Sequence, residues 1–520
     1  MEYIMLKTCF LILNLFAQAE AKPARVDPSI EFFASQAIPK ISIEIEPKEL
    51  QMLRMADRSY VPCTVTIEGV GTYKKVGIHL KGAAGSYRPL DQNPALTLNF
   101  DKFKDGQKFF GMDKIHLNNS VQDGTYLHEI LCRDIFRSAG IPAGRATHAL
   151  VKLNNRDLGL YLLVEGLDKD FLKRNFKDAT GNLYDGGFCA DIDGAKKFIS
   201  GKKGQKDDQA PLKALTAALR EPDVNKRLAS VEKLIDVDQF WTFAALELLT
   251  CHWDGYVRNR NNYRIYFDPS RENRAVFLPW GMDQMFNDPN FDVFGMGCLV
   301  SNQLMQCQGM KWRYQDTLRK VYFQHFRPYD ANKRIDEITA KLKPVRDIKG
   351  GAEDMKRRLA ARKETVEKML REMPQAPPKF GPDNTILLTD WKPALESGPS
   401  LHLQSTIDQR TCLHLKTSAD SVASWRKPMA MEPGKYRVEA LAKAVDVKPR
   451  GEGNSGVGVR ISGGERHNYI SGSTDWKTVS MEISIKEPRD VVLVLEMRAQ
   501  SGDVYFDVTT IKIVRLDTKP

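Results

Sequence analysis

The segment from His252 to Tyr263 has residue types and spacing that could support phosphoryl transfer. It reads His-Trp-Asp-Gly-Tyr-Val-Arg-Asn-Arg-Asn-Asn-Tyr and lies where a helical pattern gives way to a strand pattern. Phosphoryl transfer needs a carboxylate that receives or orients the hydroxyl of the nucleophile, with an amide oxygen and another carboxylate to hold Mg²⁺. Asp254 and Asn259, in an HxDxxxxN arrangement, supply the first two groups.

A second acidic side chain, Asp283, follows a strand-like apolar run at residues 275–279. Phosphoryl-transfer enzymes often deliver a metal ligand from the end of a strand. The two segments support each other and together predict a Mg²⁺ and nucleotide site built around Asp254 and Asp283. The structural alternative is that Asp254 caps a turn and Asp283 pairs with one of the many arginines, since short motifs also arise by chance.

The elements that must position these residues change in type along the chain. Alternating apolar residues predict strands within residues 41–100, 149–165, 262–267 and 275–278, and helical spacing predicts helices at 123–139 and 237–251 and a long basic helical stretch at 312–373. Strands first and helices afterwards, with a functional loop at the junction, indicate an α+β fold with two lobes.

The composition changes at residues 374–384, where a proline-rich run predicts a linker between two domains. Residues 38–373 would form the α+β domain. Residues 385–520 contain short alternating segments at regular spacing, which predicts an all-β jelly-roll sandwich. The closing segment, residues 502–508, resembles the last strand of carbohydrate-binding jelly-roll modules, so carbohydrate binding and a purely architectural role both stay open.

Residues 1–21 have the pattern of an export signal, with Lys7, an apolar run and small residues that predict cleavage after Ala19 or Ala21. We therefore expect a secreted, periplasmic or cell-surface protein. The formal net charge of +11 is spread along the sequence, which favours a solvated basic surface over a nucleic-acid-binding patch. The rest of the sequence contains no apolar stretch typical of an integral membrane segment.

Several blocks, in the same order along the chain, resemble the spore coat protein H (CotH) kinase family of secreted, atypical protein kinases. They span about residues 40–370 and comprise residues 111–120 (Gly-Met-Asp-Lys-Ile-His-Leu-Asn-Asn-Ser), Gly159-Leu160-Tyr161 with Glu165, residues 181–184 (Gly-Asn-Leu-Tyr), residues 254–263, and Pro279-Trp280 with Asp283.

The resemblance implies a kinase-like fold that binds Mg²⁺ and ATP and phosphorylates exported or cell-surface proteins. It makes Asp254 the catalytic base and Asp283 the principal metal ligand. Asn259 fits the general kinase spacing, whereas Asn262 fits the asparagine-aromatic pattern of the family, so either amide is a candidate for binding the metal and the nucleotide.

Two positions depart from the family pattern. Gly281 stands where members commonly have an aspartate, and Asn93 stands where they tend to have a lysine. The lysine that binds nucleotide phosphates is then either absent or replaced by Lys81, across the hairpin, with Glu165 as its candidate partner. These departures support a second hypothesis, a catalytically weak or inactive pseudokinase that acts as a surface or coat binding and adhesion module.

Overall fold

The computed structural model describes residues 27–202, 207, 209–307, 309–373, 377–451, 455–486 and 489–517. The expected export signal at residues 1–21 lies outside this part of the chain, as does the start of the expected linker at residues 374–384. The predicted combination of helices and strands is confirmed, and the C-terminal part is rich in strands.

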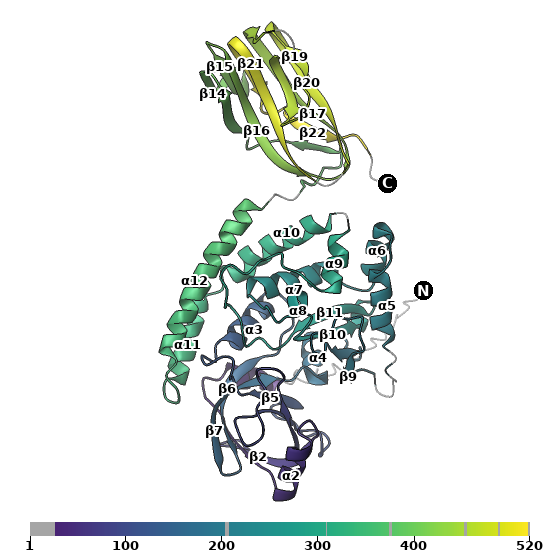
Figure 1. The fold of residues 1–520 in the computed structure, drawn as a ribbon, viewed down its shortest axis with the longest axis vertical. Coiled ribbons are helices and arrows are strands. Elements are labelled where there is room, and N and C mark those ends of the chain that lie inside the picture. Colours follow the sequence, from purple (N-terminus) through teal and green to yellow (C-terminus); the bar gives the residue numbers. More distant parts are fainter. Residues whose placement is uncertain are drawn as a thin grey trace, which may run out of the picture.

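The N-terminal strands close into a barrel, because β1 pairs with β2 on one side and, in parallel, with β6 on the other. The barrel order is β1-β2-β3-β4-β5-β7-β6, at the bottom of Figure 1. Its strands are β1 (Lys40–Glu44), β2 (Val61–Ile67), β3 (Gly71–Lys81), β4 (Ala95–Asn99), β5 (Lys114–Asn118), β6 (Ala146–Leu153) and β7 (Arg156–Glu165). Alternate side chains such as Ile41 and Ile43 are buried, so the period of two in the sequence fills the barrel interior.

A small sheet follows the barrel in the sequence, and helices lie before, between and after the barrel strands. The sheet has the order β11-β10-β8-β9, with β8 (Leu183–Asp185), β9 (Lys197–Ser200), β10 (Tyr263–Asp268) and β11 (Arg274–Pro279). The helices up to this sheet are α1 (Pro28–Ala34), α2 (Pro47–Met55), α3 (His128–Ser138), α4 (Lys169–Asn175), α5 (Ala210–Leu219), α6 (Val224–Val231), α7 (Val237–Leu249), α8 (Tyr256–Asn259) and the 3₁₀ turn η1 (Pro269–Arg271).

Helix α3 begins later than the pattern predicted. The carboxylate of Asp123 accepts hydrogen bonds from the backbone N–H groups of Thr125 at 2.9 Å and His128 at 3.0 Å. These contacts hold the intervening residues in a turn, as an Asx side chain does when it competes with helical hydrogen bonding.

The predicted helical stretch at 312–373 is divided into separate helices, because Pro328 and Pro344 interrupt it. The segments are α10 (Met310–Val321), the π-helical turn η2 (Tyr322–Phe326), α11 (Ala331–Leu342) and α12 (Lys349–Glu372), preceded by α9 (Leu299–Met305). Among the described residues, no helix is both long and apolar enough to cross a lipid bilayer.

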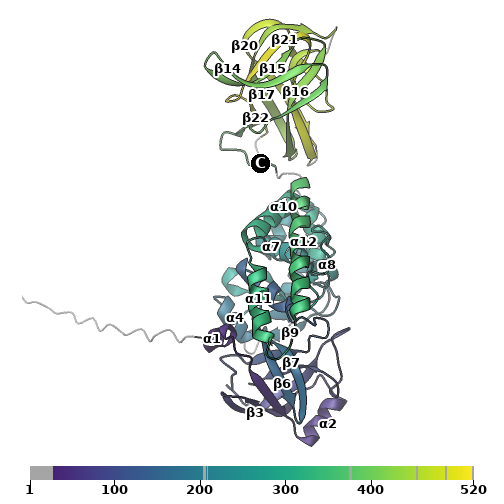
Figure 2. The same cartoon turned by 90° about the vertical axis from the view of Figure 1, so that its left-hand side faces the viewer.

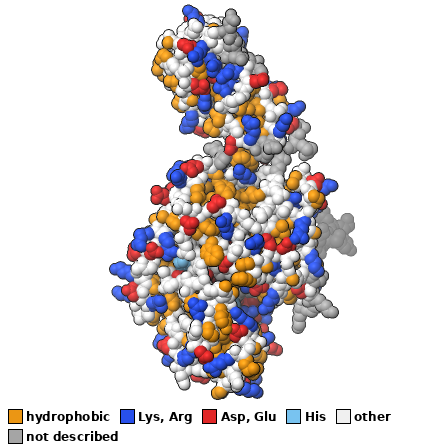
Figure 3. All heavy atoms as spheres, viewed as in Figure 1, with side chains coloured by type: hydrophobic (Ala, Val, Ile, Leu, Met, Phe, Trp, Pro, Cys, Tyr) orange, Lys and Arg blue, Asp and Glu red, His pale blue; other side chains and the backbone are white. Residues whose placement is uncertain are grey.

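The C-terminal strands form their own core, which runs from Leu388 to Ile513 and shares no residue with the cores that end at Met373. Figures 1 and 2 show these strands beyond the end of α12. They are β12 (Thr385–Leu387), β13 (Lys392–Ser397), β14 (Ser400–Ile407), β15 (Arg410–Thr417), β16 (Ser421–Met431), β17 (Gly434–Pro449), β18 (Gly456–Ile461), β19 (His467–Ile470), β20 (Gly472–Ile485), β21 (Arg489–Asp507) and β22 (Lys512–Arg515). Basic and acidic side chains are interspersed over much of the face in Figure 3, as expected for a spread charge.

Candidate active site

Asp254 lies in the loop between α7 and α8, where three asparagine side chains donate to it. Asn259 donates to Oδ1 at 2.6 Å, while Asn261 and Asn262 donate to Oδ2 at 3.1 Å and 2.8 Å. Asn262 also donates to the backbone oxygen of Asp254 at 3.1 Å. The structure therefore brings both candidate amides, Asn259 and Asn262, to the same carboxylate.

Hydrogen bonds join the Asp254 loop to the segment that carries Asp283. His252 Nε2 lies 3.2 Å from the backbone oxygen of Gly281, and Trp253 Nε1 donates to the side chain of Gln284 at 3.1 Å. These contacts hold the residues before Asp254 against the residues on either side of Asp283, which come from the end of β11. Two acidic side chains far apart in the sequence thus stand on neighbouring segments.

A buried carboxylate, Glu247, holds the other end of the Asp254 loop. It is 0% exposed and accepts the backbone N–H groups of Tyr256 at 3.1 Å and Val257 at 2.8 Å, at the start of α8. A Cβ at Gly255 would lie 2.7 Å from this carboxyl group, so only glycine fits there. The Nδ1 atom of His252 lies 3.6 Å from Glu247. Glu247 therefore positions the loop from behind.

Lys81, the last residue of β3, reaches Glu129 of α3 through the side chain of Asn118. The Lys81 ammonium donates to Asn118 Oδ1, and Asn118 Nδ2 donates to Glu129 Oε1 at 2.5 Å. Burial lowers the pKa of Lys81 to about 8, although the charges of Glu129 and Asp283 oppose the shift. The lysine thus faces acidic groups from both the barrel-side helix α3 and the end of β11.

Asp283 is half-buried between charged neighbours. Burial, followed by the negative charge of Glu129, raises the pKa of Asp283 to about 6, while the charges of Lys81 and His252 oppose this. A carboxylate whose ionised form is disfavoured by its surroundings gains from a bound cation. Asp283 therefore has the electrostatic environment expected of a metal ligand.

The ring of Trp280 lies among cationic side chains. Lys81 Nζ is 5.6 Å from the ring centroid, and the guanidinium carbons of Arg133 and Arg264 are 5.5 Å and 5.1 Å from it. Such cation–π contacts hold positive groups in place. The positive charges next to Asp283 suit an anionic ligand such as a nucleotide polyphosphate.

The donor set fits magnesium. Mg²⁺ prefers oxygen ligands and is usually held by one or two carboxylates plus the phosphates of its substrate. Asp283 supplies a carboxylate, and the amides of Asn259 and Asn262 supply further oxygens near Asp254. Within the part of the chain that the structure describes, no group of three or more His, Cys, Asp or Glu side chains could hold a metal by itself.

Two other residues from the sequence prediction lie in structural contacts. Glu165 is 2% exposed and accepts from Arg145 at 2.9 Å, and it also pairs with Arg174. The structure thus places Glu165 in an ion-pair cluster with two arginines and does not bring it to Lys81. The Asn93 side chain accepts the Tyr161 hydroxyl at 2.8 Å.

Lys81 lies across the hairpin from the segment that follows Asn93, because Lys81 in β3 pairs with Ala95 in β4. This is the arrangement in which Lys81 could replace the lysine expected at position 93. Sequence reasoning missed Asn118 and Glu129 as its neighbours. Asn118 belongs to the 111–120 block and Glu129 to the predicted helix at 123–139, but only the fold brings the Glu129 side chain to Asn118 of β5.

Gly281, where the resemblance implied an aspartate, has a left-handed backbone with φ +49. The Asn262 side chain occupies the space that a side chain at position 281 would need. The missing carboxylate and the position of Asn262 are therefore linked.

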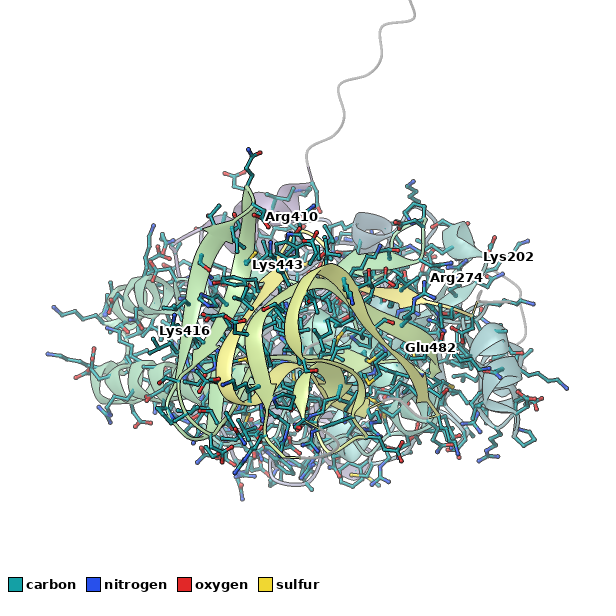
Figure 4. The ribbon with its side chains drawn as sticks, turned by 90° about the horizontal axis from the view of Figure 1, so that it is seen from above. Lys202, Arg274, Arg410, Lys416, Lys443 and Glu482 are labelled. Atoms are coloured by element: carbon teal, nitrogen blue, oxygen red, sulfur yellow. The ribbon has the colours of Figure 1, made fainter. Side chains whose placement is uncertain are left out.

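The C-terminal strands carry a separate polar cluster around Asp408. Asp408 accepts from Lys443 at 2.7 Å and from the indole N–H of Trp476 at 3.0 Å, and Arg410 lies over the Trp476 ring at 5.2 Å. Figure 4 shows Arg410 and Lys443 near each other on these strands. Next to them, His414 stacks on Tyr505 with 4.2 Å between ring centroids.

Similar solved structures were found that each match about a quarter of this chain. TmCBM61 in complex with beta-1,4-galactotriose matches 24% of this chain and 88% of its own, with 12% identity and a TM-score of 0.18. CBM35 from Cellvibrio japonicus Abf62 matches 24% of this chain and 93% of its own, with 11% identity and a TM-score of 0.16.

Similar sequences were found for the N-terminal region. Invasin CotH2 of Rhizopus delemar is 25% identical over 283 residues, which cover 51% of this chain and 47% of the relative. Inner spore coat protein H of Bacillus subtilis is 24% identical over 263 residues, which cover 47% of this chain and 68% of the relative. The chain spans about half the length of the Rhizopus relatives that match over the longest stretches.

A family model described as CotH kinase protein matches residues 78–350, a stretch that includes Lys81, Glu129, Asp254 and Asp283 and makes up more than half of the sequence. The family predicted from the sequence blocks is confirmed, and the chain belongs to the CotH kinase protein family.

Proposed function

We propose that this chain is an atypical protein kinase that transfers the γ-phosphoryl group of ATP to a hydroxyl of an exported or cell-surface protein. The observation that carries the proposal is the meeting of Lys81, Glu129 and Asp283 beside the segment that holds Asp254. A basic group for phosphates, a carboxylate for the metal and a carboxylate for the acceptor hydroxyl are the parts that phosphoryl transfer requires.

In this proposal each side chain has a definite task. Lys81 and Arg264 would bind phosphate oxygens, and Asp283 with one of the amides, Asn259 or Asn262, would hold Mg²⁺, which would supply positive charge against the phosphates. Asp254 orients the acceptor hydroxyl and accepts its proton. The hydroxyl oxygen forms a bond to the γ-phosphorus as the bond from that phosphorus to the β–γ bridging oxygen breaks, and ADP leaves.

The barrel and the helical region would then act as the two lobes of a kinase-like domain at residues 38–373. Lys81 and Glu129 approach from the barrel side, whereas Asp254 and Asp283 come from the segments around α8 and β11. Mg²⁺ bound with a nucleotide between the lobes would offset the like negative charges of Glu129 and Asp283, and the bound complex would stabilise the folded state.

Phosphate transfer from labelled ATP to a generic protein acceptor, or to the chain itself, tests the proposal. Asp254→Asn and Asp283→Asn keep the side-chain shape but remove the charge, and each should reduce incorporation by at least about a hundredfold. Asp105→Asn, at an exposed position away from the site, is the matched control. Full incorporation by both site variants would refute the assignment.

The second candidate is a pseudokinase that serves as a surface binding or adhesion module. Gly281 favours it, because the site has one carboxylate fewer than the family pattern. The names of the Rhizopus and Bacillus relatives, which describe invasins and a spore coat protein, are compatible with such a role and with a surface or coat location. Nucleotide binding separates the candidates, since only the kinase needs Mg²⁺ and ATP.

For the C-terminal strands we propose a jelly-roll sandwich that binds carbohydrate through the aromatic and charged cluster around Asp408. The Tyr505 ring and the Trp476 ring offer flat apolar faces, and Arg410 and Lys443 offer hydrogen-bond donors. Titration of the protein with soluble oligosaccharides, compared with Trp476→Ala, would test this. Equal binding by both forms would exclude this face.

A further inference from the structure

A cavity of about 90 Å³ lies between α1, α3, β6 and α11, and neither Asp254 nor Asp283 lines it. Figure 2 shows α1, α11 and β6 on the same side of the molecule. Its lining includes the polar or charged side chains of Ser35, Thr147, His148, Arg334, Glu337 and Lys341, together with the apolar Ile130 of α3. The space is large for one water, which needs roughly 10–15 Å³, and is of the size of a small polyatomic ion.

Lys341 brings to the cavity a positive charge that forms no ion pair with a described residue. Its ammonium donates to the backbone oxygen of Ser35 at 3.2 Å and to Thr147 Oγ1 at 2.9 Å. Among the described residues these uncharged oxygens are its hydrogen-bond partners. Burial, followed by the charge of Arg334, lowers the pKa of Lys341 to about 8. A nearby anion would offset both the burial of the Lys341 ammonium and its repulsion by Arg334.

Arg334 is a second positively charged side chain at the cavity, and acidic residues hold it in place. Its Nε donates to Asp134 at 3.1 Å and one terminal nitrogen donates to Glu337 at 3.2 Å. Glu337 is exposed and lies on the rim of the cavity. The guanidinium is thus anchored by two acidic groups, of which Glu337 also lines the cavity, and its other terminal nitrogen donates to no side chain among the described residues.

His148 supplies an unpaired group of a different kind. It is 1% exposed, its Nε2 lies 3.1 Å from the backbone oxygen of Tyr126, and its Nδ1 is buried without a hydrogen-bond partner among the described residues. A carbonyl oxygen can only accept, so Nε2 carries the proton and Nδ1 of the neutral ring is an acceptor. A buried acceptor of this kind destabilises the fold when it stays unpaired.

The cavity thus combines two cationic donors, a hydroxyl and a buried acceptor. An oxyanion without protons would satisfy Lys341, Arg334 and Thr147 but would leave His148 Nδ1 unpaired. Hydrogen phosphate differs from sulfate at neutral pH because it keeps a P–OH group. Its hydroxyl could donate to His148 while its other oxygens accept from the cations.

We infer that the cavity between α1, α3, β6 and α11 is a binding site for inorganic phosphate. In this site Lys341 and Arg334 bind the anionic oxygens, Thr147 donates its hydroxyl, and His148 Nδ1 accepts a hydrogen bond from the phosphate hydroxyl. This site is separate from the proposed nucleotide site. Its floor includes Ile130, the residue after Glu129 on α3, so the ligand would contact the helix that carries Glu129.

Isothermal titration of the full-length protein with inorganic phosphate, near neutral pH and at constant ionic strength, tests the inference. We expect one saturable site, with sulfate bound at least about tenfold more weakly because it has no hydroxyl for His148. Absence of saturable phosphate binding would overturn the inference. Equal affinities for sulfate and phosphate would overturn the role of His148.

Variants locate the site. Lys341→Gln should weaken phosphate binding by at least about tenfold, whereas Lys333→Gln, at an exposed position on the same helix, should not. Thr147→Val, which keeps the side-chain shape, gives an independent test if Lys341→Gln unfolds. Phosphate binding that is unchanged in both Lys341→Gln and Thr147→Val would refute the site.

The nucleotide site is distinguished by Lys81→Met, which should leave this phosphate binding intact whether or not the protein is a kinase. If Lys81→Met were the variant that lost phosphate binding, the phosphate would bind at the Asp283 site, and the inference would be overturned.

Discussion

The amide oxygen of Asn262 lies 2.2 Å from the point where a Cβ carbon at Gly281 would stand. No side chain can be added at position 281 unless Asn262 moves, and Asn262 is held by its two hydrogen bonds to Asp254. The absence of an aspartate at this position is therefore tied to the way in which the Asp254 loop is packed.

Gly281→Ala should destabilise the protein by about 1–3 kcal/mol, because alanine is strained at φ +49 and its Cβ displaces Asn262. Urea unfolding measures the change. Gly350→Ala, where a Cβ would meet nothing within 4 Å, is the control and should be neutral or slightly stabilising. Equal effects of the two substitutions would contradict the packing argument.

Lys81→Met should abolish the thermal stabilisation by ATP and Mg²⁺, since the substitution keeps the length of the side chain but removes the charge that faces Asp283. A ligand at a hundred times its dissociation constant stabilises the native state by about 2.7 kcal/mol. Thermal unfolding with and without nucleotide measures this difference. Lys74→Met, an exposed lysine on the same strand, should keep the full shift.

Lack of any nucleotide-dependent shift in the unmodified protein would favour the pseudokinase. A shift that survives in Lys81→Met would place the phosphates elsewhere.

Glu247→Gln should destabilise the protein by about 1–3 kcal/mol, because the amide replaces one of the two acceptor oxygens that hold the N–H groups of Tyr256 and Val257. If the proposed activity is present, phosphate incorporation should fall as well, since the Asp254 loop loses its support. Glu364→Gln, on the exposed side of α12, is the control. A stable but inactive Glu247→Gln would instead indicate a direct chemical role.

His148 should make stability depend on pH. Burial lowers the pKa of His148 from 6.5 to about 4, the hydrogen bond to Tyr126 opposes this, and the charges of Lys341 and Arg334 add to it. The unfolded chain binds a proton to this histidine at a higher pH than the folded chain does. Stability is therefore complete above about pH 6.5 and falls as the pH drops towards 4.

The free energy lost in this way is up to about 3 kcal/mol. His148→Gln should flatten the pH dependence of the urea unfolding free energy in this window, whatever its effect on absolute stability. An unchanged slope would mean that other groups control the acid response.

Local patterns predicted much of the fold. The period of two in β1 and the apolar spacing of α7 gave elements close to those observed, because β1 buries alternate side chains and α7 is buried over most of its surface. The start of α3 was predicted too early because the carboxylate of Asp123 forms side-chain contacts that no periodicity reveals. The closure of the barrel was not predicted, since it depends on the pairing of β1 with β6, strands separated by about a hundred residues.

The site was predictable where its residues lie in one segment. Asp254, Asn259 and Asn262 are close in the sequence and meet in the structure. Glu129 could not be found in this way, because its link to Lys81 passes through Asn118 on a third element. The partner proposed for Lys81, Glu165, has the right charge, but the nearby arginines Arg145 and Arg174 engage it.

Closure of the barrel also limits how another polypeptide can associate with this protein. In the described barrel each strand has a neighbour on both sides, so a partner cannot extend it by adding a strand there. The C-terminal sheet, in contrast, has edge strands, and at one of these edges, β14, Leu401 and Leu403 are 57% and 39% exposed. Strand-to-strand assembly, or aggregation of the isolated C-terminal region, is therefore open to an edge such as β14 and closed to the barrel.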